Sequence, residues 1–366
     1  MKICCLIDSL NSGGAQRQMT WLVRSLVELG HDVRLLTYHQ FDHYLPLVQS
    51  VGVEPENVES SSKAGRFWNV RSAIRRHQPD AIISFLDTPN LLGVFASLPP
   101  KRIPIIVAER NHDIGGKNLS NRVRFNAFRQ ASKVVTNCWS QNDFVKIHFP
   151  FLREKLHTIV NCVDLEKFRP VERHDEKKLA IMVAASVCDR KNPMRLIRAS
   201  AILCKENVPH SIDWYGNNFY RDGSPTSESK CFLECQRMIG ELGLKDTFQF
   251  HGPVADIHSL YGNYDVTCLP SLREGCPNVV CESMACGVPL LTSDHGDMRL
   301  MVGEQHGFRF DPMFESEIAS AINRMASLSR EQRQQMGRNC RLYAEETLGP
   351  KRFASEYQGL IEQVVS

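Results

Sequence analysis

Several kinds of segment are missing from this 366-residue sequence, and each absence excludes a class of protein. No stretch reaches the ~18 apolar residues that a membrane-spanning helix needs. The first residues lack the basic start and long apolar run of a secretory signal peptide. The net charge is only +3, which argues against a nucleic-acid-binding protein. We therefore expect a cytoplasmic protein, either free or attached peripherally to a membrane, with no nucleic-acid partner.

Recognisable metal sites are also missing. The 13 cysteines include no C-x-x-C pair, and Cys4, Cys5 and Cys268 lie within apolar runs. They are predicted to be buried free thiols of a reducing compartment. Cys231 and Cys235 lie four residues apart on an expected helix, but no further ligand is spaced to complete a metal site. Because the sequence also contains no Asp-x-Asp triad, we expect neither a bound metal nor another cofactor.

Charge is distributed unevenly along the chain. Residues 1–170 contain 22 Lys+Arg and 15 Asp+Glu, a balance of +7, whereas residues 171–366 contain 22 and 26, a balance of −4. A basic first half is suited to an anionic membrane or an anionic acceptor. Ordinary scatter of surface charge explains the difference equally well.

Predicted strands and helices alternate through the first half. Residues 2–7 form a short apolar run typical of a buried parallel strand. Residues 15–29 carry apolar side chains at helical spacing, and Gly30 is suited to end that helix. A strand at 33–37 completes a β-α-β unit. A further helix is predicted at 69–76, and further strands are predicted at 81–85, 103–108, 133–136 and 156–160.

The pattern restarts after a charged, solvated linker at 172–178. Helices are predicted at 193–205, 231–242 and 278–286. Strands are predicted at 180–184, 211–215, 247–250, 266–270 and 289–292. Two such α/β halves predict two Rossmann-like, doubly wound domains that face a central cleft, with ligands at the carboxyl ends of the strands.

A glycine-containing loop follows the first predicted strand. In Ser12-Gly13-Gly14-Ala15, two glycines allow a ligand to approach the backbone closely. The helix that follows presents N–H groups and the positive end of its dipole. A diphosphate or a sugar is suited to this position. The segment does not fit G-x-G-x-x-G, so dinucleotide binding is not favoured, and a plain tight turn is the alternative.

A longer segment at 269–289 indicates a function much more specifically than the glycine-containing loop does. A strand ends, a glycine loop turns, and a short helix begins near Pro277. Glu282 lies about one turn inside that helix, where a carboxylate can accept two hydrogen bonds from a ribose diol. Glu274 lies in the preceding loop, placed to contact a transferred sugar. Simple pairing of Glu282 with the helix dipole, worth only ~0.3–1 kcal/mol, is the alternative.

These residues make the chain similar to glycosyltransferase family 4, a group of retaining transferases with the two-domain GT-B fold. The family pattern E-G-x-P-x-x-x-x-E-x-M-A-x-G-x-P is met from Glu274 to Pro289. Segments at 251–265 and 161–170 also resemble the family. The resemblance implies an N-terminal acceptor-side domain at 1–170, a nucleotide-sugar-binding domain at 171–345, and a helix at 346–366 that crosses back to the first domain.

The resemblance implies donor-binding roles residue by residue. Glu282 would hold the nucleotide ribose, and Glu274 would contact the donor sugar near its anomeric carbon. Lys191 would neutralise the leaving diphosphate, because a fixed cation stabilises charge that develops on the departing oxygen. Further contacts to the diphosphate or sugar are implied for Gly14, Arg190, Val254, Asn278 and Val279.

Three positions depart from the family pattern. Ser186 stands where the family commonly has an arginine, so one phosphate clamp is missing or is replaced by Arg190. The usual G-G-x-x-E segment reads Gly296-Asp297-Met298-Arg299, which puts a contact to the diphosphate or acceptor in doubt. Cys162 replaces the glycine at the domain junction.

The acceptor side is less well defined. Family members usually supply a histidine from a strand end of the first domain, and here the strand at 103–108 is followed by Glu109-Arg110-Asn111-His112. His112 is a candidate catalytic residue beside Glu274 and Lys191, although Arg110 aligns with the usual histidine as well or better. Arg110 and Asp87 are the candidate acceptor-binding residues. Ordinary turn chemistry is the alternative for Asp87.

The predicted activity is metal-independent, retaining transfer of a sugar from a UDP- or GDP-sugar to an acceptor hydroxyl. The resemblance implies a glycan or lipid-linked acceptor in bacterial surface polysaccharide or glycolipid synthesis, at the cytoplasmic face of the inner membrane. Two alternatives stay open. A nucleotide-sugar 2-epimerase has the same fold, and a non-catalytic nucleotide-sugar-binding protein is favoured by Ser186.

Overall fold

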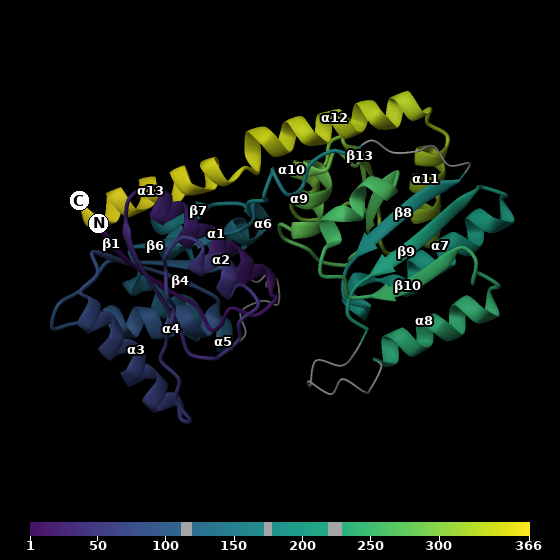
Figure 1. Ribbon diagram of the computed structural model, residues 1–366. Helices are drawn as coiled ribbons and strands as arrows, with labels where there is room; N and C mark the ends of the chain where they lie inside the picture. The colour runs from purple at the N-terminus through teal and green to yellow at the C-terminus, as the bar shows by residue number, and fades with distance from the viewer. Residues whose placement is uncertain (111–118, 172–177, 219–228) are drawn as a thin grey trace. The chain divides into compact units, whose positions relative to one another are not determined.

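The computed structural model describes residues 1–110, 119–171, 178–218 and 229–366. The chain forms two compact units (Figure 1). The first comprises Met1–Cys162 together with Pro350–Ser366, and the second comprises Val163–Gly349. Each unit is built on one sheet of parallel strands, which is the α/β architecture that the alternating sequence pattern predicts.

Seven parallel strands form the sheet of the first unit, in the order β3-β2-β1-β4-β5-β6-β7. They are β1 (Lys2–Leu6), β2 (Asp32–Thr37), β3 (Glu56–Asn57), β4 (Ala81–Phe85), β5 (Ile105–Glu109), β6 (Lys133–Thr136) and β7 (Leu156–Thr158). The strand order changes direction between β1 and β4. Ligands of doubly wound sheets bind at such a switch point, beyond the carboxyl ends of the strands.

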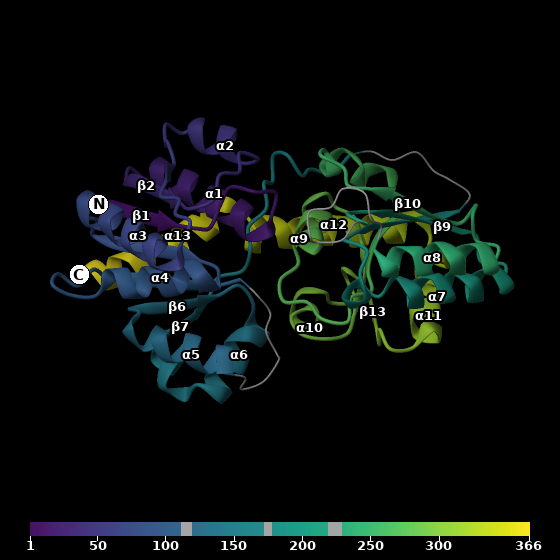
Figure 2. The same ribbon diagram turned by 90° about the horizontal axis from the view of Figure 1, so that it is seen from below.

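Helices lie against the first sheet (Figure 2). They pack on it through their apolar faces. One core cluster includes Met19 and Leu22 of α1 with Phe353 of α13, and the other includes Ile74 of α3 and Phe125 of α5. The helices are α1 (Gly14–Glu28), α2 (Leu45–Gln49), α3 (Lys63–His77), α4 (Asp87–Ser97), α5 (Leu119–Ala127), α6 (Trp139–His148) and α13 (Pro350–Val365).

Six parallel strands form the sheet of the second unit, in the order β10-β9-β8-β11-β12-β13. They are β8 (Leu179–Ala184), β9 (His210–Tyr215), β10 (Phe248–Gly252), β11 (Val266–Leu269), β12 (Leu290–Ser293) and β13 (Gly307–Phe310). The helices are α7 (Pro193–Lys205), α8 (Lys230–Glu241), α9 (Asn278–Ala285), α10 (Met298–Met301), α11 (Glu315–Ala326) and α12 (Arg330–Thr347). The switch point of this sheet lies between β8 and β11.

The last two helices belong to different units (Figure 1). A capping box formed by Ser329 and Gln332 begins α12, which packs on α9. By contrast, α13 contacts α1, β4 and β5 of the first unit. Arg341 of α12 donates hydrogen bonds to the carbonyl oxygens of Leu165 and Phe168, which ties the junction segment to the second unit. The boundary between the two units therefore falls after Cys162, whereas the sequence predicts a domain boundary after residue 170.

Several local predictions can be compared with the structure. Gly30 follows α1 with φ +82, as expected for the residue after a helix. Asp87 lies not in a simple turn but at the start of α4. Cys4, Cys5 and Cys268 are free and fully buried. Within the described residues, no helix is long and apolar enough to cross a membrane, and no group of three His, Cys, Asp or Glu could hold a metal ion.

Candidate functional site

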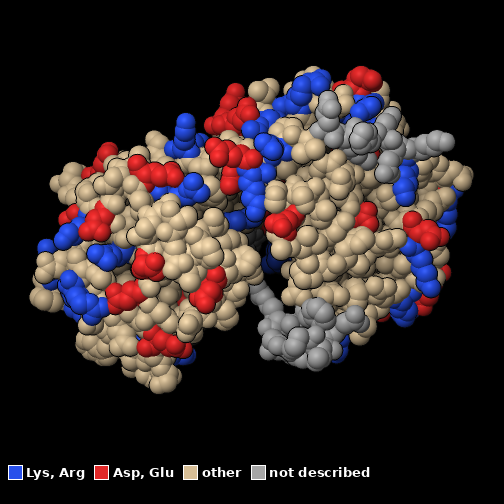
Figure 3. Space-filling model, in the orientation of Figure 1, with Lys and Arg blue, Asp and Glu red and all other residues tan. Residues whose placement is uncertain are grey.

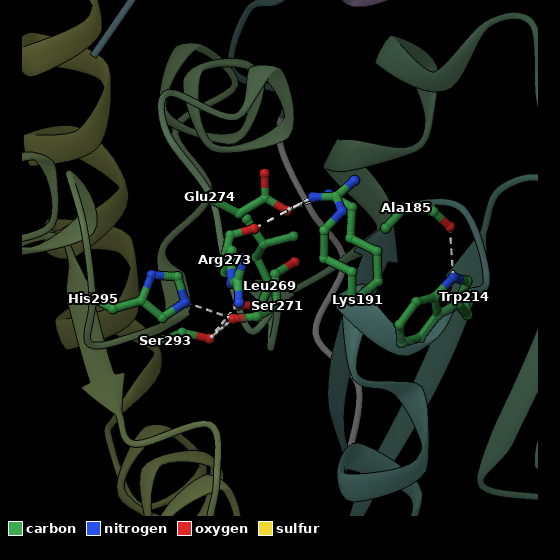
Figure 4. Close-up of polar contacts among 10 residues, drawn as sticks. Ala185, Lys191, Trp214, Leu269, Ser271, Arg273, Glu274, Ser293 and His295 are labelled. Carbon is green, nitrogen blue, oxygen red and sulfur yellow. Dashed lines mark hydrogen bonds and ion pairs between the residues drawn. The ribbon is translucent and has the colours of Figure 1, made fainter. Parts of the chain in front are cut away.

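Two loops at the switch point of the second sheet bring the predicted donor-side residues together. β8 leads through a short 3-10 turn (Asp189–Lys191) into α7, and β11 leads through a loop into α9. Because β8 and β11 are paired, parallel neighbours, the loops after them meet at one edge of the sheet. Lys191 and Glu274 accordingly face each other across these loops (Figure 4).

An ion cluster forms where the two loops meet. Lys191 Nζ lies 2.5 Å from Glu274 Oε1, and Arg190 Nη1 lies 3.2 Å from the same oxygen. The Lys191 and Glu274 side chains are 13% and 11% exposed, so water screens their attraction less than that of a surface pair. Two cations share this one carboxylate, which makes the cluster suited to an additional anion.

Buried backbone contacts fix the first loop against the second. Asn192 precedes α7 with φ +61, a conformation that asparagine tolerates better than most residues. Its side-chain amide donates hydrogen bonds to the carbonyl oxygens of Pro270 at 3.0 Å and Pro312 at 2.8 Å. The Leu272 N–H donates to the carbonyl oxygen of Arg190 at 2.8 Å. The backbone that carries the cations is therefore held by two neighbouring segments, the loop after β11 and the residues after β13.

Further hydrogen bonds hold the loop ends (Figure 4). The Ser271 carbonyl oxygen accepts from Ser293 Oγ and from the His295 ring Nε2, both at 2.7 Å. On the β8 side, Trp214 Nε1 donates to the carbonyl oxygen of Ala185 at 2.7 Å. The tryptophan is fully buried in the core, so it fixes the turn after β8 to the sheet itself.

The amino end of α9 lies next to the ion cluster in the chain. Pro277 is its N-cap, and Asn278 and Val279 are its first residues, where backbone N–H groups point out of the helix. Glu282 is only 5% exposed, and its Oε2 accepts a 2.9 Å hydrogen bond from the hydroxyl of the fully buried Tyr261. This bond orients the Glu282 carboxylate, a contact that the sequence pattern does not reveal.

One further donor-side candidate of this unit and two departures from the family pattern lie outside this cluster. Val254 is 39% exposed and follows β10, which is an edge strand two positions from β8. Ser186 is exposed in the turn after β8. Arg299 of α10 pairs with Asp294 at 3.3 Å. The arginine of the segment that departs from the family pattern therefore has an ion-pair partner five residues away in the chain.

In the first unit, Gly14 and Arg110 lie at the carboxyl ends of the strands. Gly14 is the first residue of α1, directly after the loop that follows β1. Arg110 follows β5 and stacks on the Phe85 ring at 4.0 Å. Its guanidinium donates to Asn161 Oδ1 at 3.0 Å and to the Tyr357 hydroxyl at 2.8 Å. Arg110 is thus engaged within its own unit.

Asp87 belongs to a charged network whose other two members are buried. Arg124 of α5 is 5% exposed, and its Nη1 lies 2.5 Å from Asp87 Oδ1 and 3.4 Å from Oε2 of the fully buried Glu109. Leu86, just before Asp87, has φ +78 and ψ 158, a strained conformation that costs a side-chain-bearing residue ~1–3 kcal/mol. Such strain gathers at functional sites, and here it lies at the end of β4, at the switch point. The other predicted residue, His112, lies outside the described residues.

Two family models together match most of the chain. The model described as "Glycosyl transferases group 1" matches residues 164–343, and the model described as "Glycosyltransferase Family 4" matches residues 12–167. The chain belongs to glycosyltransferase family 4. As a member of that family it is a glycosyltransferase that transfers sugars from nucleotide sugars.

Individual relatives of this family 4 chain are distant in sequence but cover most of its length. A Campylobacter jejuni enzyme, GalNAc-alpha-(1->4)-GalNAc-alpha-(1->3)-diNAcBac-PP-undecaprenol alpha-1,4-N-acetyl-D-galactosaminyltransferase, is 26% identical and the match covers 81% of this chain and 80% of that one. A glycosyltransferase structure from Rickettsia africae matches with a TM-score of 0.84 at 15% identity, and the match covers 100% of this chain and 98% of that one. The structure of Anabaena HepE in complex with UDP-glucose matches with a TM-score of 0.81 at 18% identity, and the match covers 99% of this chain and 100% of that one. These structures show that the chain has a GT-B-like fold.

The sequence of this family 4 enzyme does not reveal that Arg124, Glu109 and Tyr261 contact residues of the two candidate sites. One signal was available for Arg124. Its spacing from Asn121 and Phe128 places it on the same face of the helical segment as a buried phenylalanine, which is unusual for an arginine without a partner. The partner itself lies in another element and could not be read from local sequence.

Proposed function

We propose that this family 4 enzyme is a retaining glycosyltransferase that moves a sugar from a UDP- or GDP-sugar to a hydroxyl of a glycan or lipid-linked glycan. The observation that carries the proposal is the cluster of Lys191 and Arg190 around Glu274, one loop before the amino end of α9. The name of the C. jejuni relative specifies an undecaprenyl-diphosphate-linked glycan, which supports a lipid-linked acceptor here. The HepE complex makes UDP the first nucleotide to test.

The diphosphate of the donor would lie between the cations and the first N–H groups of α9. Negative charge grows on the departing oxygen as the glycosidic bond breaks, and Lys191 and Arg190 would stabilise it without a metal ion. Because both cations already rest on Glu274, they are held in place before the donor arrives. Such prior positioning avoids reorganisation during the reaction.

The two glutamates would divide the rest of the donor between them. Glu282 would accept hydrogen bonds from the ribose diol, in the orientation that the Tyr261 hydroxyl gives it. Glu274 would contact the sugar close to its anomeric carbon, where positive charge develops in the transition state. Retention of configuration is proposed from the family resemblance.

The acceptor would bind at the switch point of the first unit. Asp87 is 42% exposed while one of its oxygens is held by Arg124, so the side chain is both oriented and accessible. Peripheral association with the cytoplasmic face of the inner membrane is supported by the balance of +7 in residues 1–170. On the face in view in Figure 3, acidic and basic side chains are interspersed over the first unit, so only short-range attraction to anionic lipid is expected.

One observation favours a second candidate, a non-catalytic nucleotide-sugar-binding protein. The exposed Ser186 supplies no positive charge at the position where the family commonly has an arginine. Slow release of nucleotide from the donor in water distinguishes the two candidates. A transferase loses that activity in Glu274→Gln, whereas a binding protein has none to lose.

Calorimetric titration with UDP, GDP and ADP tests the proposed donor site. We expect one nucleotide to bind to the wild type and to bind at least tenfold more weakly to Glu282→Ala, a loss of ~1.4 kcal/mol. Glu241→Ala is the matched control, because Glu241 is an exposed glutamate of α8 in the same unit. If none of the three nucleotides binds to the wild type, the proposed function is wrong.

A further inference from the structure

Two thiols in the donor segment have no part in the proposed donor contacts. Cys276 lies in the loop before α9, and Cys281 is the fourth residue of that helix. Their Sγ atoms are 3.7 Å apart, and the two residues are 5% and 1% exposed. A disulfide has an S–S length of ~2.0 Å, so the sulfur atoms need to approach by only about 1.7 Å to form one.

We propose that Cys276 and Cys281 form a reversible disulfide that weakens the donor site. This inference rests on the proposed function, because it assigns a consequence to the two glutamates. Cys276 is two residues after Glu274, and Cys281 directly precedes Glu282. A bond between the thiols would therefore link the loop that carries one glutamate to the helix that carries the other.

The chemistry requires a two-electron oxidant, for which a peroxide is sufficient. The sulfur of Cys276, the more exposed of the two, attacks a peroxide oxygen, the O–O bond breaks, and a sulfenic acid and water form. The sulfur of Cys281 then attacks the sulfenic sulfur, the S–O bond breaks, and the oxygen leaves as a second water. Two thiols have lost two electrons and two hydrogens. A dithiol reductant returns both by thiol–disulfide exchange.

The helix resists the movement more than the loop does. Val280 and Ser283, on either side of Cys281, are fully buried, and Ser283 Oγ donates a 2.8 Å hydrogen bond to Thr267 Oγ1 of β11. Rotation of the two side chains provides part of the approach between the sulfur atoms. The rest must come from movement of the loop toward α9. Glu274 would then shift relative to Lys191 and lose the 2.5 Å contact. A misplacement of about 1 Å in an active site can cost about 10²-fold in rate.

Peptide mass spectrometry after peroxide treatment tests bond formation directly. Trypsin cleaves after Arg273 and Arg299 and at no Lys or Arg between them, so Cys276, Cys281 and Cys286 fall in one peptide. The purified protein is treated with hydrogen peroxide, blocked with a thiol alkylating reagent and digested. We expect this peptide to lose two hydrogens and carry one alkyl group, on Cys286, and we expect dithiothreitol to restore three alkylation sites.

Single-turnover release of nucleotide from the donor, measured on the same samples, tests the consequence. We expect oxidation to lower this rate at least tenfold, because Glu274 is displaced from Lys191, and we expect dithiothreitol to restore it. Both Cys276→Ser and Cys281→Ser should keep their rate after peroxide, and using both guards against one of them failing to fold. Cys286→Ser is the matched control, since it removes a thiol of the same peptide but should respond as the wild type does.

Two outcomes overturn the proposal. One is an intact thiol pair at peroxide concentrations that oxidise the exposed Cys204. The other is a complete disulfide that leaves the rate of nucleotide release unchanged. These results are distinct from failure of the proposed function, in which the reduced wild type binds no nucleotide at all.

Discussion

Replacing Lys191 with alanine should separate stabilisation of the leaving group from ordinary donor binding. The ammonium lies 2.5 Å from Glu274 Oε1 and is 13% exposed, so it acts in a partly dehydrated site. The departing diphosphate carries more negative charge than the intact donor does. Lys191 should therefore stabilise the transition state more than the bound donor, which is the condition for an effect on kcat.

The expected size follows from comparable groups in other active sites. Removal of one fixed group that stabilises a developing oxyanion costs ~2.7–4 kcal/mol, or about 10²–10³ in kcat. Arg190 also contacts Glu274 but is 55% exposed, so it should compensate only in part. We expect Lys191→Ala to lower kcat by about 10²–10³-fold and to weaken binding of free nucleoside diphosphate more than binding of the intact nucleotide sugar.

The measurement is single-turnover release of nucleotide, with calorimetric titration of donor and product on the same preparations. Lys205→Ala is the matched control, because Lys205 is exposed in the last turn of the helix that Lys191 precedes. Glu274→Gln should change product binding in the opposite direction, since it removes a negative charge beside the diphosphate. An unchanged kcat in Lys191→Ala, or equal weakening of donor and product, would refute this account of the cation.

Three further predictions concern contacts that support the sites. Gly337→Ala should cost ~1–3 kcal/mol and lower the melting temperature, because the added Cβ would lie 2.1 Å from the carbonyl oxygen of Gly287. Tyr261→Phe should weaken nucleotide binding severalfold in calorimetry without abolishing it, since Glu282 stays but loses its orienting hydroxyl. Burial lowers the pKa of His210 below 6.5, so the unfolded chain binds more protons. The urea midpoint of the wild type should fall as pH falls below about 6.5, and that of His210→Gln should fall less steeply. An equal dependence of the two midpoints on pH would contradict the assignment of this effect to His210.

The loop and helix that carry the two glutamates could be anticipated because they belong to one continuous segment. The predicted helix at 278–286 differs by one residue from α9, and the predicted strand at 266–270 differs by one residue from β11. A proline before the helix, a glycine after it and a glutamate one turn inside are local signals, and local signals are what a sequence displays. The hydrogen bond from Tyr261 to Glu282 was missed because it joins separate elements.

The contacts that orient Asp87, a candidate acceptor residue, could not be anticipated, for the same physical reason. What orients Asp87 is Arg124, which comes from a helix that follows the next strand, and what distinguishes the position is the backbone of Leu86. Neither a long-range ion pair nor a positive φ at a leucine leaves a pattern in the local sequence, since leucine is an ordinary residue for a strand end. The strain is maintained only because packing around β4 and α4 enforces it. The pattern of the loop and helix therefore supports a nucleotide-sugar donor, whereas the acceptor must be sought in contacts that only the folded chain brings together.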